Sequence, residues 1–349
     1  MAVGAFSVGA LVFRFAAGKA IDKYGSKPVL TAGMLLSLAA MTGYPLGVTL
    51  GVVMLFRFLH GIGISGYGAA ALTTTSLLFS EEKTTEAVAM YTLFTMIGSG
   101  IATSIALSLF DCGGFLGVVA VGFAATFCSM VLFPKNKAGK RREASETLPV
   151  WPIISRASVF LSAVNLFMIN FSFSTMMTFL PLFILLRGGS GMGTFFLAYA
   201  IAVVGTRMIV NAVCKKVPSP QLTLYILLAF GVIMPFVAYF HDAVSLAVAG
   251  SVVGVAFGFA FPSLAGFVAQ QTSIQERGTA YGFFVTGNDL GQVAGAIGMG
   301  FFVDKVGYEA VFSAVGVATL LFGAFYGFFL MPKLQQVSKA LVIERAKAV

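Results

Sequence analysis

The chain is a succession of long apolar runs separated by short polar breaks. A helix that spans a bilayer needs about 20 mostly apolar residues, whereas a membrane strand shows apolar residues at every second position. The runs have the length of helices and lack that alternation. We therefore expect eleven transmembrane helices near residues 1–19, 28–48, 52–79, 87–110, 114–133, 157–186, 192–213, 222–240, 244–270, 280–303 and 309–331.

The longest polar break divides these runs into two groups. It covers residues 134–156, contains proline and carries six cations. We expect a helical bundle at 1–133, a basic linker at 134–156, a second helical bundle at 157–331 and a tail at 332–349. The expected fold is all-α, a polytopic membrane protein built from two bundles.

The two groups match when the sequence is shifted by 193 positions. Eight residue pairs coincide: Arg14/Arg207, Lys23/Lys216, Gly61/Gly254, Ser80/Ser273, Ala87/Ala280, Gly98/Gly291, Asp111/Asp304 and Gly114/Gly307. One spacing over such a length indicates a parallel internal repeat, as in transporters whose halves are related by an axis along the membrane normal. The run at 157–186 has its counterpart before Met1. We therefore expect the first half to lack its first helix and Met1 to be a truncated or misassigned start, with a true eleven-helix protein as the alternative.

The positive charges predict the orientation. Alternate breaks and the tail hold 17 of the 22 Lys and Arg residues, and the opposite breaks hold only Arg187 and Lys305. Cytoplasmic loops carry the excess of cations, so the face with these breaks, called the basic side below, is predicted to be cytoplasmic. The expected location is the cell membrane, with a cytoplasmic C-terminus.

Composition excludes several other classes of protein. The chain is 58% hydrophobic and 10% charged, against about 25% charged in soluble domains. Its net charge of +9 comes from cations between apolar runs rather than from a groove with exposed aromatics, so we expect no nucleic acid partner. Three cysteines without close spacing and two histidines give no metal set and no nucleophile–base pair. We expect no enzyme, cofactor or metal.

Two motifs carry a resemblance to a known family. The run Gly18-Lys-Ala-Ile-Asp22-Lys-Tyr-Gly25-Ser-Lys27 lies in a break on the basic side, and Arg57-Phe-Leu-His60-Gly61-Ile-Gly63 lies in the third apolar run. They resemble the loop signature G-x-x-x-D-x-x-G-R-K and the fourth-helix element R-x-x-x-G-x-G of the major facilitator superfamily. The segment from Tyr281 to Tyr308 is similar to the eleventh helix and following loop of its efflux permeases. Ser26 replaces the usual arginine, and the antiporter signature of the fifth helix is reduced to Gly98-Ser-Gly100.

The resemblance implies a fold and a mechanism. Two bundles would enclose a site at the membrane midplane and rock between outward-open and inward-open states. Gly18, Asp22, Gly25 and Lys27 would form a gating loop. Asp22 would meet the start of the eleventh helix near Thr279 to Gly282, where unpaired N–H groups and the helix dipole favour a carboxylate. Arg57 would take part in proton transfer, as in antiporters.

The residues themselves add candidates for chemistry. Asp289 is the only acid well inside an apolar run, a costly position that marks a functional candidate for proton coupling. Asn288 and Gln292 beside it would complete a polar stripe facing water, the alternative being a packed cluster that joins helices.

Further candidates are Arg57 with His60 for proton coupling. The candidates for binding a substrate are Asn165, Asn170, Asn288 and Gln292. The alternative for Arg57 is snorkelling to the outer interface, and we expect Arg14 and Arg207 to snorkel to the basic side.

We therefore expect a secondary active transporter that couples protons to the efflux of an amphipathic small molecule. Two alternatives remain: uptake of a small metabolite by proton symport, or a truncated membrane protein that does not transport. The expected partners are the small-molecule substrate, the proton and the lipid bilayer. Substrate, direction of transport and oligomeric state are left open.

Overall fold

A computed structural model describes residues 2–46, 49–80, 83–132, 149–187, 192–240 and 242–336. These residues are almost wholly helical and contain no strand, which confirms the all-α prediction. Most of the predicted linker, up to residue 148, and the tail from residue 337 lie outside the described part of the chain. Among the described residues, eight helices are long and apolar enough to cross a membrane: Ser26–Leu46, Leu50–Leu78, Gly113–Leu132, Ala157–Leu186, Met192–Lys216, Ser219–Val237, Ala243–Gln271 and Tyr308–Gln336.

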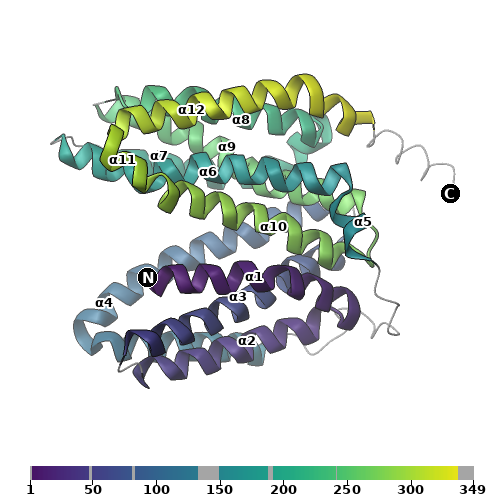
Figure 1. Ribbon diagram of the computed structural model, residues 1–349, viewed down its shortest axis with the longest axis vertical. Coiled ribbons are helices and arrows are strands. Elements are labelled where there is room, and N and C mark those ends of the chain that lie inside the picture. Colours follow the sequence, from purple (N-terminus) through teal and green to yellow (C-terminus); the bar gives the residue numbers. More distant parts are fainter. Residues whose placement is uncertain are drawn as a thin grey trace. The chain divides into compact units, whose positions relative to one another are not determined.

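The helices follow the apolar runs closely (Figure 1). Those before the linker are α1 (Ala2–Tyr24), α2 (Ser26–Gly43) with the 3-10 turn η1 (Tyr44–Leu46), α3 (Leu50–Leu78) and α4 (Thr84–Leu132). Those after it are α5 (Val150–Ile154), α6 (Ala157–Leu186), α7 (Met192–Lys216), α8 (Ser219–Val237), α9 (Ala243–Gln271), α10 (Arg277–Val293), the π turn η3 (Ala294–Gly298), α11 (Gly300–Val306), α12 (Tyr308–Phe325) and the π turn η4 (Tyr326–Leu330). The short helix α5 lies at the end of the predicted linker.

The chain forms two compact units, which are described separately below. Unit 1 comprises Met1–Ser80, Tyr91–Ile154 and Thr272–Thr286, and unit 2 comprises Glu81–Met90, Ser155–Gln271 and Gly287–Val349. Each unit thus contains one short segment from the other half of the sequence. The segment in unit 1 is the start of α10, and the segment in unit 2 is the start of α4.

Helix boundaries recur at the offset of 193 residues that the sequence showed. Helices α3 and α9 both begin and end at equivalent positions. Helices α2 and α8 begin at equivalent positions, and so do α4 and α10. The repeat therefore extends to the boundaries of the helices and is not limited to a few identical residues.

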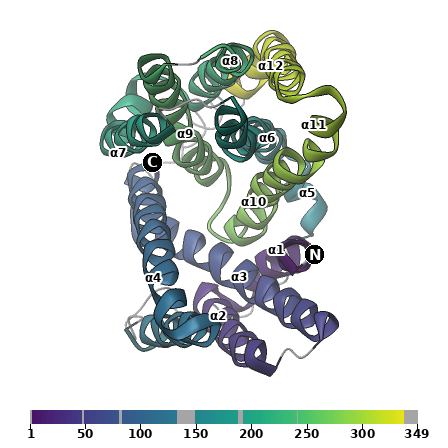
Figure 2. The same ribbon diagram turned by 90° about the vertical axis from the view of Figure 1, so that its left-hand side faces the viewer.

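Equivalent glycines make equivalent helix contacts. In unit 1, Gly61 of α3 lies against the backbone carbonyl of Phe6 in α1. In unit 2, Gly254 of α9 lies against the backbone carbonyl of Tyr199 in α7, and Tyr199 is the repeat counterpart of Phe6. A Cβ at either glycine would overlap that carbonyl, so each pair of helices needs a residue without a side chain to approach this closely. Figure 2 shows the paths of α1 and α3 and of α7 and α9 within their units.

Two further equivalent glycines interrupt helices. Gly114 and Gly307 have φ angles of 58° and 84°, a conformation that residues with a Cβ rarely adopt. Gly307 ends α11 and precedes α12, whereas Gly114 is a non-helical point inside α4. The two helices expected at 87–110 and 114–133 are therefore the two parts of α4. The helix expected at 280–303 is divided into α10, η3 and α11.

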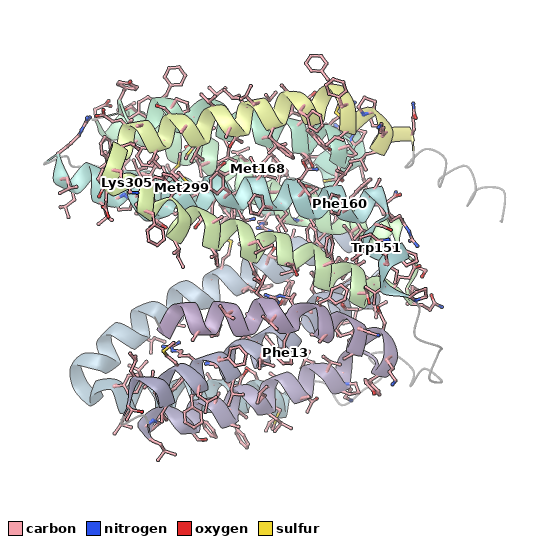
Figure 3. All side chains as sticks on the ribbon, in the orientation of Figure 1. Phe13, Trp151, Phe160, Met168, Met299 and Lys305 are labelled. Carbon is pink, nitrogen blue, oxygen red and sulfur yellow. The ribbon has the colours of Figure 1, made fainter. Side chains whose placement is uncertain are left out.

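The outer faces of the helices are apolar. Exposed side chains include Phe328 at 80%, Leu132 at 79% and Trp151 at 74% of their full accessible area. The stick view shows such side chains pointing away from the helices along their length (Figure 3). An apolar surface of this extent suits a lipid environment, in agreement with the composition.

Candidate functional site

The predicted gating loop meets the start of α10 inside unit 1. The two carboxylate oxygens of Asp22 accept hydrogen bonds from the backbone N–H groups of Gly278 and Thr279, each at 2.7 Å. Both N–H groups belong to the first turn of α10, where no carbonyl of the helix is available to pair with them. The carboxylate therefore binds where the helix dipole favours negative charge. The contact implied by the family resemblance is present, and its role in gating remains a prediction.

Small residues allow Asp22 to reach this position. A Cβ at Gly18 would lie 2.7 Å from the carbonyl oxygen of Gly278, and a Cβ at Gly282 would lie 3.0 Å from the carbonyl oxygen of Arg14. Helices α1 and α10 thus approach each other backbone to backbone.

The rest of the gating loop turns the chain from α1 into α2. Gly25 makes this turn with a φ of 88°, and Lys27 lies in the first turn of α2. The spacing from Gly18 to Lys27 therefore combines a close helix contact, a capping carboxylate and a tight turn.

The start of α10 is also fastened to α3. Arg277 is buried, and its Nη1 donates to the backbone carbonyl of Ser76 at 3.2 Å. Tyr281, one turn later, is also fully buried. The start of α10 is therefore held in unit 1 by Arg277 as well as by Asp22.

Asp289 lies in the second part of α10, which belongs to unit 2. Its side chain is half-buried, and its Oδ1 accepts a hydrogen bond from Asn288 Nδ2 at 3.2 Å. The side chain of Gln292 is exposed, while its backbone carbonyl accepts a hydrogen bond from Ser174 of α6 at 2.9 Å. Two members of the predicted polar stripe thus interact directly, and the third has an exposed side chain.

The two asparagines of α6 are enclosed by their own unit. Asn170 is 2% exposed, donates to the carbonyl of Leu166 at 3.0 Å and packs against Gly291 of α10. Asn165 is 1% exposed, and neither polar atom of its amide group has a hydrogen-bond partner among the described residues. The hydrogen bond of Asn170 lies within α6 itself. Substrate binding by Asn165 and Asn170 remains a prediction.

Arg57 and His60 share an aromatic partner that the sequence did not reveal. The hydroxyl of Tyr44 lies 2.6 Å from His60 Nδ1, and the guanidinium of Arg57 lies 5.1 Å from the centre of the Tyr44 ring. Phe6 contacts the His60 ring edge-on at 5.6 Å between centroids. Tyr44 belongs to η1, which follows α2, so only the folded chain brings it to α3. Its place at the end of an apolar run gave no signal of this pairing.

Arg14 and Arg207 correct one expectation. They are 7% and 2% exposed, so the prediction that they snorkel to the basic side is wrong. The packing of each unit encloses their guanidinium groups, and Arg14 Nη1 approaches the carbonyl of Ser65 at 3.5 Å. The repeat therefore places a buried arginine at the same position in both units.

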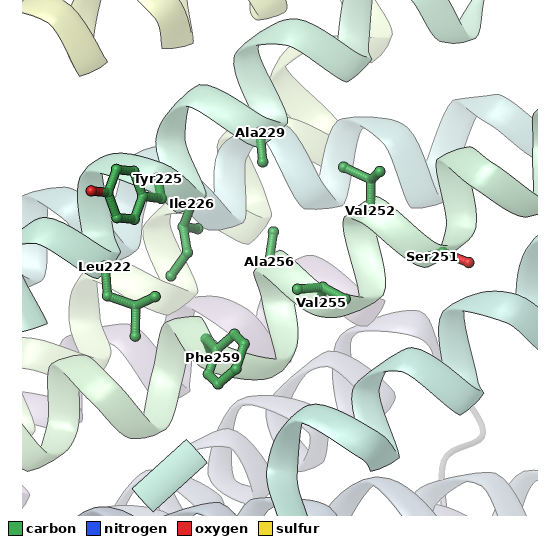
Figure 4. A pocket seen from close by; sticks show the side chains of 9 residues that line it. All are labelled: Leu222, Tyr225, Ile226, Ala229, Ser251, Val252, Val255, Ala256 and Phe259. Atoms are coloured by element: carbon green, nitrogen blue, oxygen red, sulfur yellow. The ribbon is translucent and has the colours of Figure 1, made fainter. Parts of the chain in front are cut away.

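A groove between α8 and α9 in unit 2 has a volume of about 410 Å³ (Figure 4). Its lining is apolar apart from the hydroxyl groups of Tyr225 and Ser251, and it includes none of the predicted site residues. Such a lining offers no group to bind a proton or to pair with a charged substrate. In the described part of the chain, no group of three His, Cys, Asp or Glu residues could hold a metal ion.

Comparisons with known proteins agree with this architecture. The staphylopine export protein of Staphylococcus aureus is 23% identical over 337 residues, which cover 91% of this chain and 84% of that protein. The Escherichia coli fucose:proton symporter has a similar fold, with a TM-score of 0.73 and 14% identity over 93% of this chain and 89% of its own. A human organic anion transporter gives a TM-score of 0.70 and 16% identity over 93% and 83% of the two chains.

A family model covers nearly the whole sequence. The model of the Major Facilitator Superfamily matches residues 1–272 and 222–346. Its solved structural relatives are membrane transporters rather than enzymes. The predicted family is thereby confirmed, and the chain belongs to the Major Facilitator Superfamily.

Proposed function

We propose that this chain is a secondary active transporter that exports an amphipathic small molecule by alternating access, driven by protons. The contact of Asp22 with the start of α10 carries the proposal. It joins segments from the two halves of the sequence through hydrogen bonds that water can replace. Similarity to an export protein supports the direction, and similarity in fold to a proton symporter supports the coupling ion.

The proposal includes eleven membrane spans. The eight helices that meet the length and apolarity requirement would be joined by α1, by the first part of α4 and by α10 with α11. The basic side would face the cytoplasm, as the charge distribution predicts. The family's first helix would then have no counterpart among these residues.

Asp22 would act as a latch on the basic side. Hydrogen bonds to a charged group stabilise a contact by about 1.5–3 kcal/mol each, so the pair is strong enough to favour one state and weak enough to be broken during a cycle. With the latch formed the transporter would face outward, and with the latch broken it would open to the cytoplasm. A ligand shifts such an equilibrium only by its difference in affinity for the two states.

Asp289 would carry the coupling proton. A carboxyl group inside an apolar helix can hold a proton at one stage and release it at another, while Asn288 supplies a neutral donor to the charged form. Binding of substrate would be favoured in one protonation state. The group of Arg57, His60 and Tyr44 is the second place where a proton could be transferred.

The latch is tested by the neutral variant Asp22→Asn in proteoliposomes, with an amphipathic fluorescent dye as the transported probe. Asparagine keeps the size of the side chain but removes its charge and one acceptor oxygen. We expect the transport rate to fall with expression and folding intact. The matched control is Asp304→Asn, which removes an exposed acid of α11. Unchanged transport in Asp22→Asn contradicts the latch.

The coupling is tested by proton release. Addition of the dye to purified protein in weakly buffered detergent should release protons from the parent chain and from Asp304→Asn, but not from Asp289→Asn. Proton release that persists in Asp289→Asn would show that another group carries the coupling proton.

The direction of transport needs a separate measurement in vesicles with an imposed pH gradient. Extrusion of the dye against proton entry supports export, whereas accumulation together with protons supports the symport alternative. No gradient dependence and no transport in any folded form supports a non-transporting protein.

A further inference from the structure

The start of α4 occupies in unit 2 the place that the start of α10 occupies in unit 1. Helix α4 begins at Thr84 and α10 at Arg277, which are equivalent positions in the repeat. The start of α10 packs with α1 and α3, whereas the start of α4 packs with α7 and α9, the repeat counterparts of those helices. The two starts are therefore candidates for the same mechanical role.

One hydrogen bond defines the contact of α4 with α7. Asn211 Nδ2 donates to Glu86 Oε2 at 3.0 Å. Asn211 is the repeat counterpart of Gly18, and Glu86 is the counterpart of Thr279. In unit 1, Gly18 lies directly against Thr279. The same two positions of the repeat thus touch in both units.

The chemistry of the two contacts differs. In unit 1 the carboxylate stands on α1 and the donors are N–H groups of α10. In unit 2 the carboxylate stands in the first turn of α4, where the helix dipole favours it, and the donor stands on α7. Thr85 of α4 also lies against Gly266 of α9, so this start is held by close packing as well.

The position of the contact allows it to open. Glu86 is exposed and Asn211 is half-buried, so water can replace their hydrogen bond without leaving a buried charge unpaired. Lys215 lies four residues after Asn211 on the same face of α7 and is exposed. Both partners lie next to the breaks that define the basic side.

We propose that Glu86 and Asn211 form a second latch on the basic side, which closes and opens together with the latch of Asp22. The inference rests on the proposed alternating access. The second latch makes closure depend on a contact in each unit, so that neither half of the sequence opens alone. Because it consists of one hydrogen bond near the surface, its loss should change the ratio of closed to open forms by roughly two- to tenfold.

The test measures distances between spin labels at Lys83→Cys and Lys216→Cys, two exposed positions at the start of α4 and the end of α7. The background carries Cys112→Ser, Cys128→Ser and Cys214→Ser, and the protein is placed in lipid nanodiscs without substrate. The parent chain should show a shorter and a longer distance. Glu86→Ala and Asn211→Ala should each lower the ratio of shorter to longer by roughly two- to tenfold, and the double variant should lower it no further.

Two additional variants keep the test independent of folding defects. Asp304→Ala removes an exposed acid far along the sequence and should leave the ratio unchanged. Asn211→Asp places two carboxylates together, so it should favour the longer distance at neutral pH and recover the shorter one when acid protonates one of them. Effects of Glu86→Ala and Asn211→Ala that simply add, or no recovery of Asn211→Asp in acid, overturn the second latch.

The measurement separates this inference from the proposed function. It requires neither substrate nor a proton gradient. Distances that shift as expected in a chain that transports nothing support the latch and reject the export proposal. Intact dye export with distances that no variant changes rejects the latch alone. A single distance in the parent chain under all conditions overturns both.

Discussion

Units 1 and 2 contain equivalent helices, but they differ in the contacts that bind the short segment from the other half of the sequence. Equivalent helices begin at equivalent residues, and equivalent glycines bring them together. At the contact itself the residues diverge: Gly18 corresponds to Asn211, and Asp22 corresponds to Lys215. The repeat has therefore kept the positions of contact while the side chains that make it have changed.

This difference implies unequal strength. Asp22 accepts two hydrogen bonds from a helix start, whereas Glu86 accepts one from an asparagine. Unit 1 joins its segment by backbone contact, which tolerates no side chain at Gly18. Unit 2 joins its segment partly through exposed side chains, which tolerate substitution. Variants at equivalent positions should therefore have unequal effects.

The largest effect is expected from exchanging the residues at position 18 and at its repeat counterpart, position 211. Gly18→Asn introduces a Cβ 2.7 Å from the carbonyl oxygen of Gly278, so α1 and α10 must separate. Dye transport in proteoliposomes should fall by more than about tenfold, since the separation also removes the hydrogen bonds of Asp22. Asn211→Gly loses one hydrogen bond and should reduce transport only a few-fold, by about the ratio given above. Equal losses in the two variants would contradict the asymmetry. Gly193→Asn, where a Cβ meets nothing within 4 Å, is the control.

The shared frame predicts equal effects at another pair. Gly61→Val and Gly254→Val each force a side chain against a backbone carbonyl in the core of one unit. Overpacking of this kind destabilises by about 1–3 kcal/mol, and both variants should lower the midpoint of thermal unfolding in detergent by similar amounts. A large effect in one unit and none in the other would show that the repeat does not extend to packing.

A smaller effect is expected for a pair of residues in unit 1 that has no equivalent pair in unit 2. The repeat equivalents of Tyr44 and His60 are Val237 and Val253, so the hydrogen-bonded pair exists in unit 1 alone. Tyr44→Phe removes the hydroxyl and leaves the ring beneath Arg57. We expect a few-fold fall in pH-driven dye transport and a loss of folding stability of no more than about 1 kcal/mol, because a single hydrogen bond is removed. Tyr225→Phe in the apolar groove is the matched control. Transport equal to that of the control removes Tyr44 from the mechanism.

The smallest effect concerns the starts of α3 and α9. Thr49 caps α3, and its counterpart Asp242 caps α9 through hydrogen bonds to the backbone N–H groups of Val244 and Ser245. These hydrogen bonds lower the pKa of Asp242 below its ordinary value of 3.8. The largest cause is the hydrogen bond from the Ser245 side chain, and the backbone N–H groups lower the pKa further. A lowered pKa means that the cap stabilises α9 at neutral pH and loses this contribution as the pH falls through the lowered pKa.

Hydrogen exchange measures this pH dependence. Acid should reduce the protection of the Val244 and Ser245 amides, corrected for the intrinsic rate, but not that of Val52, which Thr49 caps. Asp242→Thr should abolish the difference between the two helices. Loss of protection in both helices with the same midpoint would point to general acid unfolding instead.

The helices could be predicted because hydropathy is a local property of the sequence, and the repeat could be predicted because it keeps one constant offset along the chain. Apolar runs gave the spans, and the constant offset gave the equivalence of α3 and α9. The division around η3 was missed, because the apolar run expected as one helix at 280–303 shows no break in hydropathy where α10 ends and η3 begins. Arg14 and Arg207 were misjudged because burial depends on neighbours, which hydropathy does not show.

The candidate site was predicted only where a motif named both partners. The family signature indicated Asp22 and the start of α10, which the structure brings together. Tyr44 was missed because its partner His60 lies on the next helix, and Asn211 was not connected with Glu86 because 125 residues separate them. Contacts between distant segments follow from packing, and one sequence gives no signal for them.

Alternating access as proposed here requires that the basic side opens and closes and that Asp22 controls the step. The most direct test is the distance between spin labels at Lys23→Cys and Gln275→Cys, exposed positions beside Asp22 and before α10 in unit 1. We expect two distances in the parent chain, with the shorter one lost in Asp22→Asn and kept in Asp304→Asn. A single distance that Asp22→Asn leaves unchanged would contradict it.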